Sequence, residues 1–406
     1  MVNVIGLGYI GLPTALMFAK SGIEVIGTDI NKSLVDSLSN GQLPFEERGL
    51  EELFEKAVLN EIKFTTEYQK TDIYIIAVPT PYINSSKKLD PKYVISAVNK
   101  VLDVCKKGAI LIIESTIAPG SIDRYVRPEI EKRELALGED IHLVHAPERI
   151  IPGNMIYELE HNSRTIGADD PRIGRIVKEL YSSYCKAEIV VTDIRTAEMS
   201  KVVENTYRDI NIAFANELAK ICRTDNLDVY EIIRIANKHP RVNILQPGPG
   251  VGGHCISVDP WFLVGDYPGL ANIILAARKI NDSMPEFVLK RVHEIMKEKG
   301  MSDLSRVGLY GLTYKENVDD IRESPTLQLL EVMEKHLAPT LKAYDPMVGC
   351  DIVKNQYHNF DNFLADVDLI VIMVAHDEIK KQLNKLDKKI VLDTRNICNF
   401  DGVYKL

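Results

Sequence analysis

Apolar and polar positions follow two alternating patterns over residues 1–120. Short runs rich in Val and Ile, of which "VNVIGLG", "IEVIGTDIN", "DIYIIAVPTP" and "AILIIESTIAPG" are the clearest, are separated by stretches with helical spacing of apolar residues. Strands that alternate with helices are typical of a parallel sheet covered by helices. The runs "HLVHAPER" and "RTIGA" extend the series. We therefore predict an α/β domain over residues 1–191.

The pattern becomes helical over residues 192–292. The segment "TAEMSKVVENTYRDINIAFANELAKICRTD" contains neither proline nor glycine, which indicates a long helix. Strands return at "SRVGLYGLTYK", "TLKAYDP", "DLIVIMVAH" and "KIVLDTRN", so we predict a second α/β domain over residues 293–406. Ligand sites are expected beyond the carboxyl ends of the strands in both sheets.

Composition and charge exclude several broad classes of protein. The 406 residues carry a formal net charge of -9, from 49 basic and 58 acidic groups, so no general nucleic-acid or membrane surface is indicated. No apolar run approaches the ~20 residues of a membrane span, and no signal-peptide pattern precedes the first strand. The six cysteines form no CxxC pair, which argues against a disulfide framework and a structural metal site. We expect a cytoplasmic protein.

A glycine fingerprint lies between the first strand and the following helical run. Its candidate cofactor contacts are Gly6, Gly8, Tyr9, Ile10 and Gly11. Glycines here permit a tight turn and the close approach of a pyrophosphate, whose charge the start of the helix favours. The next strand ends in Asp29, where a carboxylate can bind the adenosine ribose hydroxyls. That acid also repels a 2'-phosphate, so NAD is favoured over NADP despite the nearby Lys32.

Two threonines follow later strands of the same predicted sheet. Thr80 in "VPTP" and Thr116 in "ESTIAPG" would border the cofactor crevice, where they can contact the cofactor or a water. An ordinary role as turn residues at the strand ends is an equally good interpretation of both.

The stretch "PGPGVGGHCISVDPW" places Cys255 among glycines. A lone cysteine is more often a buried apolar residue than a nucleophile. A thiol beside a nicotinamide can, however, add to an aldehyde, and the resulting thiohemiacetal can be oxidised to a thioester that water cleaves. A buried filler does not need such glycines, whereas close approach of substrate and cofactor does.

Polar residues near this thiol, or at helical spacing on the long helix, can assist that chemistry. Lys201, Asn205 and Arg208 share one helical face. A solvated face is the usual explanation, but Lys and Asn together can also hold an oxygen whose charge changes during hydride transfer. Asp259 could orient a water or the lysine, or cap a turn. His254 is a weaker candidate for the general base.

The motifs "GLGYIGLP", "ESTIAPGS", "APER", "SKVVENTYRDINIAFANEL", "PGPGVGGHCISVDPWF" and "GLTYKENVDDIRESP" resemble the UDP-glucose/GDP-mannose 6-dehydrogenase family along essentially the whole chain. The resemblance implies two Rossmann-like domains joined by a helical middle domain with a long central helix, through which subunits dimerise. It also implies NAD-dependent, four-electron oxidation of the C6 alcohol of a nucleotide sugar to a carboxylate, with two NAD molecules used in succession.

The resemblance assigns roles to individual positions of this chain. Cys255 matches the nucleophile, and Glu148 matches a glutamate implicated in water activation and thioester hydrolysis. Thr116 matches a contact to the catalytic water and the cofactor, and Arg322 matches an arginine that reaches the cofactor pyrophosphate. The remaining matches to catalytic residues are Lys201, Asn205 and Asp259. Lys315 matches a basic group of the nucleotide-sugar site.

Val258 stands where UDP-glucose and GDP-mannose enzymes commonly have lysine, so the motif resembles the branch that oxidises N-acetylated sugars. UDP-N-acetyl-D-mannosamine is the favoured substrate, and UDP-N-acetylglucosamine and UDP-glucose are the alternatives. Ser257 departs from that branch, in which proline or alanine is common. The resemblance places further positions near the sugar or its diphosphate: Arg149, Ile150, Lys201, Asn205, Arg208, His239, Arg241, Gly252, Tyr314 and Arg395.

Two other functions fit part of the sequence. A two-electron NAD-dependent hydroxyacid dehydrogenase would share the first domain but would have no use for Cys255. A non-catalytic sensor of NAD or nucleotide sugars would bind both ligands without turnover. The presence of Lys201, Asn205, Cys255 and Asp259 together disfavours the sensor.

Overall fold

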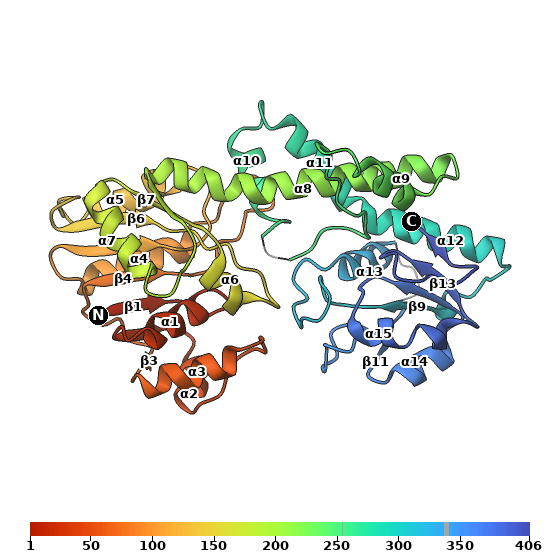
Figure 1. Cartoon of the computed structure of the whole chain (residues 1–406), viewed down its shortest axis with the longest axis horizontal. Helices are drawn as coiled ribbons and strands as arrows, with labels where there is room; N and C mark the ends of the chain where they lie inside the picture. Colours follow the sequence, from red (N-terminus) through yellow and green to blue (C-terminus); the bar gives the residue numbers. More distant parts are fainter. Residues whose placement is uncertain (254, 337–340) are drawn as a thin grey trace. The chain divides into compact units, whose positions relative to one another are not determined.

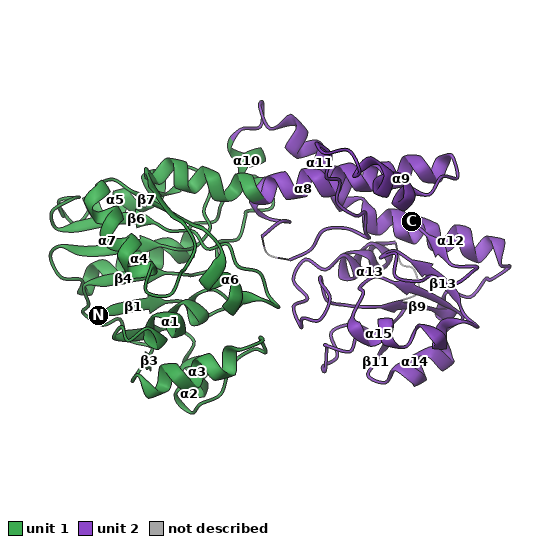
Figure 2. Ribbon diagram, viewed as in Figure 1, with its two compact units in different colours: residues 1–204, 261–266 green, residues 205–260, 267–406 purple. Residues whose placement is uncertain are grey.

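The computed structural model of the chain describes residues 1–253, 255–336 and 341–406. These residues form two compact units, which Figure 2 colours separately: 1–204 with 261–266, and 205–260 with 267–406. The long helix α8 (Ile194–Thr224) contributes to both units, as the uninterrupted helical pattern predicts.

The first unit is built on an eight-stranded sheet with the order β3-β2-β1-β4-β5-β6-β7-β8. Its strands are β1 (Val2–Ile5), β2 (Val25–Thr28), β3 (Lys63–Thr65), β4 (Ile73–Ile76), β5 (Ala109–Ile113), β6 (Ile141–His145), β7 (Arg164–Ala168) and β8 (Ile189–Thr192). Strands β1 to β6 pair in parallel, in the order of a dinucleotide-binding sheet in which the strand order reverses between β1 and β4. Ligands bind outside the carboxyl ends of the strands at such a point.

Two strands of this sheet, β7 and β8, run opposite to the other six, which departs from the parallel arrangement predicted from the sequence. Strand β7 runs antiparallel to β6, with Val144 opposite Ala168. The short helix α6 (Met155–His161) connects the two strands, and after it the chain enters the sheet in the direction opposite to β6. The order of strands and helices along the chain contains no information about this direction.

Helices cover the apolar faces of the first sheet (Figure 1). They are α1 (Gly11–Lys20), α2 (Lys32–Ser39), α3 (Leu50–Leu59), α4 (Lys92–Val104), α5 (Arg127–Glu131), α6 and α7 (Pro171–Tyr181). Every residue of α1 except Lys20 is buried, so this helix lies directly against the sheet. The same core contains Val4, Ile75 and Ile112 from the three central strands. Fully apolar strands are expected where both faces of a parallel sheet are covered.

The second unit contains a six-stranded, wholly parallel sheet with the order β11-β10-β9-β12-β13-β14. Its strands are β9 (Val307–Tyr310), β10 (Lys342–Tyr344), β11 (Gln356–Tyr357), β12 (Leu369–Ile372), β13 (Ile390–Asp393) and β14 (Tyr404–Lys405). This order is the same as that of the first six strands of the other sheet. The strand order therefore reverses between β9 and β12, which marks the expected ligand edge.

Alternate residues of the second sheet face two different groups of helices. Leu309 and Val371 belong to the core formed with α12 (Met284–Glu298) and α13 (Pro325–Lys335). Tyr310 and Ile370 belong to the opposite core, with α14 (Phe360–Asp366) and α15 (Asp377–Lys381). The helical middle comprises α8, α9 (Val229–Ala236), α10 (Asp259–Asp266) and α11 (Asn272–Asp282). The predicted fold class, two Rossmann-like domains with a long helix between them, is confirmed.

No helix in the described ranges is long and apolar enough to span a bilayer.

Candidate active site

The glycine fingerprint forms the turn from β1 into α1. Gly6 has φ +90°, and a Cβ atom there would lie 2.6 Å from the carbonyl oxygen of Ala77. A Cβ atom on Gly11 would lie 1.8 Å from the carbonyl oxygen of Gly6, so the start of the helix can pack this closely only without a side chain. At Gly8, by contrast, no atom of the described residues, apart from Gly8 and its two chain neighbours, lies within 4 Å of the position of a Cβ.

Asp29 ties this turn to the end of β2. Its carboxylate accepts hydrogen bonds from the backbone N–H of Leu7, at 2.8 Å, and of Asn31, at 2.8 Å. An acid fixed at this strand end, an open Gly8 and the start of α1 together fit a dinucleotide. Lys32 is exposed and pairs with Asp36 at 2.6 Å, so its charge is already partly offset.

The two threonines lie beyond the ends of neighbouring strands of the first sheet. Thr80, after β4, is buried, and Thr116, after β5, is half-buried. Ser115 donates a hydrogen bond to the carbonyl of Val78 at 2.7 Å, which holds these two strand ends together. Contact with the cofactor or a water stays a prediction for both threonines.

Glu148 lies in a buried charge cluster that was not predicted from the sequence. The Arg164 guanidinium forms ion pairs with Glu148 and, at 3.4 Å, with Glu114, and all three side chains are at most 3% exposed. Glu148 also accepts the backbone N–H of Arg149 at 2.6 Å. The Tyr181 hydroxyl donates to Glu114 at 3.0 Å. Burial raises the pKa of Glu114, and Arg164 opposes that rise.

Helix α8 buries two of its three predicted site residues. Lys201 and Asn205, one turn apart, are each 6% exposed, whereas Arg208 is exposed. Sequence spacing places the three on one face, but burial depends on what packs against each turn. The Asn205 amide donates a hydrogen bond to the Asp259 carboxylate at 2.6 Å. The structure therefore brings Asn205 and Asp259 together.

Cys255 lies at the turn that leads into helix α10 (Asp259–Asp266). The backbone carbonyl of Cys255 accepts the N–H groups of Val258 and Asp259, at 3.2 and 2.9 Å, and α10 starts at Asp259. Cys255 is half-buried, and Asp259 is 3% exposed. The Ser257 hydroxyl donates to the carbonyl of Gly253, which tightens this turn. His254 lies outside the described residues.

Two of the predicted nucleotide-sugar residues of the second unit, Gly252 and Tyr314, are in contact. A Cβ atom on Gly252 would lie 2.7 Å from the Tyr314 Cβ, and one on Gly253 would lie 2.8 Å from the tyrosine ring. The backbone N–H of Gly253 donates to the carbonyl of Arg322 at 3.0 Å. The glycines before Cys255 therefore allow Tyr314 and the segment at Arg322 to pack against this backbone.

The remaining predicted basic residues differ in their surroundings. Arg149 pairs with Glu204 at 2.6 Å, and Arg322 forms a two-pronged pair with Asp320, closest at 2.6 Å. Arg395 lies 3.8 Å from a carboxylate oxygen of Glu316. These ion pairs favour the structural interpretation of each arginine taken singly. The other candidates are half-buried Lys315, buried Ile150, and exposed His239 and Arg241.

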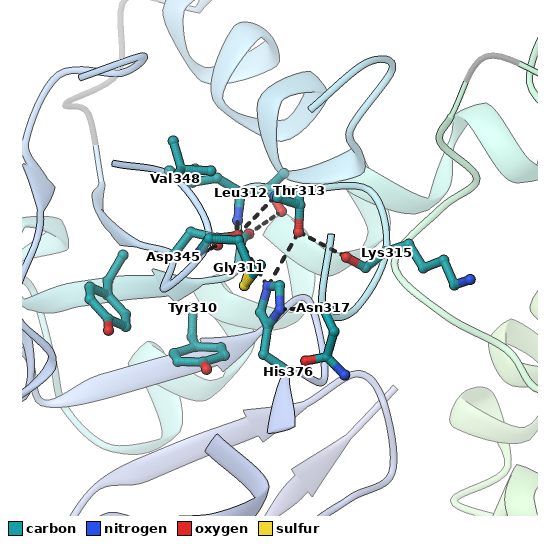
Figure 3. A network of polar contacts seen from close by, with 12 residues as sticks. Tyr310, Gly311, Leu312, Thr313, Lys315, Asn317, Asp345, Val348 and His376 are labelled. Carbon is teal, nitrogen blue, oxygen red and sulfur yellow. Dashed lines mark hydrogen bonds and ion pairs between the residues drawn. The ribbon is translucent and has the colours of Figure 1, made fainter. Parts of the chain in front are cut away.

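A second polar network, drawn in Figure 3, was not predicted from the sequence. Asp345 follows β10 and His376 follows β12, and the two side chains lie 3.2 Å apart. Both are at most 2% exposed. Their positions after the two strands that flank β9, in "AYDP" and "MVAH", were the available signal, since polar residues at such strand ends gather at one edge of the sheet.

Comparison with known proteins identifies the domains. The chain matches three models of the UDP-glucose/GDP-mannose dehydrogenase family: the NAD binding domain over residues 1–185, the central domain over 195–283 and the UDP binding domain over 308–400.

Full-length relatives agree with these domain matches. The UDP-N-acetyl-D-mannosamine dehydrogenase of Methanocaldococcus jannaschii is 43% identical over 98% of this chain and 92% of its own length. The NDP-N-acetyl-D-galactosaminuronic acid dehydrogenase of Ralstonia nicotianae is 38% identical over 98% and 96%. The solved structure of the UDP-N-acetyl-mannosamine dehydrogenase Cap5O from Staphylococcus aureus is 44% identical, covers 100% of this chain and 97% of its own, and has a TM-score of 0.89.

These matches confirm the predicted family and the NAD cofactor. The protein is an NAD-dependent oxidoreductase, and its chain belongs to the UDP-glucose/GDP-mannose dehydrogenase family.

Proposed function

We propose that the protein is a UDP-N-acetyl-D-mannosamine dehydrogenase. It oxidises the C6 alcohol of UDP-N-acetyl-D-mannosamine to a carboxylate, and one alcohol, two NAD⁺ and one water give one carboxylate, two NADH and three protons. The main support for this substrate is the 43% identity, over 98% of the chain, to a relative named UDP-N-acetyl-D-mannosamine dehydrogenase. Val258, where other branches have lysine, supports an N-acetylated sugar.

NAD, when bound at the glycine fingerprint, accepts a hydride in each of the two oxidations. The residues of this chain supply the covalent step between them. Cys255 forms a carbon–sulfur bond to the aldehyde, giving a thiohemiacetal, and oxidation of that adduct leaves a thioester. Water then breaks the carbon–sulfur bond, which releases the carboxylate and regenerates the thiol. The glycines before Cys255 allow its backbone to be approached closely.

In this scheme the C6 oxygen of the sugar is bound, and its protons are transferred, by Lys201, Asn205 and Asp259. A buried lysine and a buried amide stabilise negative charge that develops on the sugar oxygen. The hydrogen bond from Asn205 to Asp259, at 2.6 Å, fixes the orientation of the amide. Thr116 holds the water, and Glu148 takes its proton during hydrolysis of the thioester. Arg164 keeps this buried carboxylate in place.

The proposed UDP-sugar site combines the residues around Tyr314 with local positive charge. Lys315 and Arg395 bind the diphosphate, because an acidic chain must meet this anion with local cations. Arg322 reaches the cofactor pyrophosphate. The further sugar and diphosphate contacts that we propose are Arg149, Ile150, Arg208, His239, Arg241 and Gly252, with His239 and Arg241 supplied by the neighbouring subunit.

We propose the domain division 1–191, 192–292 and 293–406, and a cytoplasmic location, where NAD is available.

We further propose that the protein is a homodimer formed through α8. Tyr207, Phe214 and Ile221 are spaced seven residues apart on this helix and are 64, 48 and 54% exposed. Exposed apolar side chains repeated at this spacing form a stripe that a second helix can cover. Phe214→Glu should convert the dimer to monomer in light scattering, whereas Leu227→Glu, at an exposed apolar position outside α8, should not. A monomeric wild-type protein would contradict the dimer.

The substrate is tested by incubating the purified protein with NAD and one nucleotide sugar at a time, while NADH absorbance is followed. The sugars are UDP-N-acetylmannosamine, UDP-N-acetylglucosamine, UDP-N-acetylgalactosamine, UDP-glucose and GDP-mannose. We expect two NADH per UDP-N-acetylmannosamine and the highest kcat/KM for it. A higher kcat/KM for any other sugar would contradict the assignment. A yield of one NADH would indicate a two-electron dehydrogenase.

A further inference from the structure

The loop between β9 and residue 317 carries Tyr314 and Lys315, and buried groups of the second unit determine its shape. Figure 3 shows Asp345 and His376 directed toward Leu312, Thr313 and Asn317. These groups come from the ends of β10 and β12, the two strands that flank β9. The loop is therefore held to the sheet by hydrogen bonds to these side chains as well as by its covalent link to β9.

Asp345 binds the first part of the loop. Its carboxylate accepts the backbone N–H groups of Leu312, at 2.6 Å, and Thr313, at 3.0 Å, and that of Met347 at 2.7 Å. Burial opposes ionisation of this carboxyl group, but its hydrogen bonds from His376 and from the backbone outweigh burial and lower its pKa. Asp345 is therefore ionised at neutral pH and can accept a further proton donor.

The contacts of His376 define its tautomer. The backbone N–H of Asn317 donates to Nδ1 of His376 at 3.0 Å, so Nδ1 carries no proton. The proton of a neutral imidazole then lies on Nε2, which is 3.2 Å from both the Asp345 carboxylate and the Thr313 hydroxyl oxygen. Thr313 in turn donates to the carbonyl of Lys315 at 2.9 Å. Each of these donors has an acceptor in this arrangement.

Asn317 closes the other end of the loop by a reciprocal contact. Its backbone donates to His376, and its side-chain oxygen accepts the backbone N–H of Asp377 at 3.0 Å. Asn317 has φ +57°, a left-handed conformation that non-glycine residues adopt at some cost. The hydrogen bond from Asn317 to His376 offsets part of that cost.

The position of this loop matters for the residues on both sides of Tyr314. Tyr314 packs against Gly252 through its Cβ atom and against Gly253 through its ring, and Lys315 follows immediately. A loop that moves by a fraction of an ångström therefore shifts the contact with the glycines that precede the nucleophile and shifts a proposed diphosphate ligand.

We propose that His376 is a positioning residue for nucleotide-sugar binding: its Nδ1 holds Asn317 and its Nε2 holds Asp345 and Thr313, so that the 312–317 loop is preorganised around Tyr314 and Lys315. This inference rests on the proposed UDP-sugar site. A preorganised loop lowers the entropy that binding must otherwise remove.

The test uses three substitutions of His376 in the full-length protein. His376→Ala removes both nitrogens. His376→Asn can keep an acceptor for the Asn317 N–H, and His376→Gln can keep a donor for Asp345. His358→Gln is the matched control, because His358 is a half-exposed histidine of the same unit that also faces an aspartate, Asp351. Calorimetric Kd for UDP, KM for the nucleotide sugar, KM for NAD and kcat are measured for each variant.

We expect His376→Ala to raise the Kd for UDP and the KM for the nucleotide sugar about tenfold, the effect of losing about two net hydrogen bonds. The KM for NAD should change less than about twofold, which also reports that the variant is folded. His376→Asn should lie between wild type and His376→Ala, because it can keep the bond to Asn317, and His358→Gln should match wild type.

The inference is overturned if folded His376→Ala and His376→Asn bind UDP as wild type does, or if the KM for NAD rises as much as that for the nucleotide sugar. If His376→Ala does not fold, His376→Asn and His376→Gln decide between these outcomes. Failure of the proposed UDP-sugar site is distinguishable, since wild type itself would then bind no UDP. Turnover of a different UDP-sugar would refute only the assigned sugar, and the same variants would be compared on that substrate.

Discussion

Replacement of Arg164 by Met should destabilise the first unit strongly. Within the part of the chain that the structure describes, Arg164 is the cation that pairs with both Glu114 and Glu148, and all three side chains are at most 3% exposed. Methionine retains much of the side chain's apolar length but leaves two buried carboxylates without their counter-ion. Removing one partner of a buried ion pair lowers the free energy of unfolding by about 3–5 kcal/mol. For a unit of about 200 residues, this corresponds to a fall in Tm of roughly 6–20 °C.

The pH dependence of this loss follows from the raised pKa of Glu114. Burial raises that pKa and Arg164 opposes it, so removing Arg164 raises it further. A carboxyl group with a raised folded-state pKa contributes stability that is complete below its unfolded pKa and is lost as pH rises through the folded pKa. The Tm difference between Arg164→Met and wild type should therefore be largest near neutrality and shrink as pH falls toward about 4.3, the ordinary glutamate pKa.

Differential scanning calorimetry at several pH values measures this effect. Arg306→Met is the matched control, because Arg306 pairs with Asp368 at 2.7 Å on the surface, where both side chains are more than a third exposed. Such a pair is worth about 0–1 kcal/mol. The double variant Glu114→Gln with Arg164→Met should recover part of the lost Tm. A loss for Arg164→Met no larger than that of Arg306→Met, or one independent of pH, would refute the buried-charge explanation.

Two further substitutions separate folding from ligand binding. Gly11→Ala should lower stability by about 1–3 kcal/mol, because its Cβ would lie 1.8 Å from the carbonyl oxygen of Gly6, whereas Gly8→Ala should keep the wild-type Tm and raise the KM for NAD. Equal melting temperatures for the two variants would contradict this packing argument. Asn205→Ala should lower the free energy of unfolding by about 1–3 kcal/mol, because buried Asp259 loses one hydrogen-bond donor, and it should lower kcat more than it raises the KM for NAD. Wild-type kcat in this variant would exclude Asn205 from the reaction.

The sequence was sufficient to predict local features that depend on nearby residues. The strand–glycine–helix pattern at Gly6 to Gly11 specified the turn, since only glycine fits where the structure brings Gly11 against Gly6. The long helix followed from a segment without proline or glycine. In the same way, the glycines before Cys255 indicated a backbone that other groups approach closely, and Tyr314 packs there.

Features that depend on distant pairings were not predictable. The antiparallel direction of β7 depends on how the chain returns to the sheet, which strand order along the sequence does not encode. Arg164 and Glu114 are separated by 50 residues, and Asp345 and His376 by 31. Helical spacing also could not distinguish exposed Arg208 from buried Lys201.

The number of NADH molecules formed per nucleotide sugar, measured for wild type and Cys255→Ser, tests the central claim most directly. A single turnover with limiting UDP-N-acetylmannosamine and excess NAD, followed by NADH absorbance and mass spectrometry of the product, supplies this number. Wild type should give two NADH and the uronate, and Cys255→Ser should lose the second oxidation. Two NADH per sugar from Cys255→Ser at the wild-type rate would contradict the thioester route.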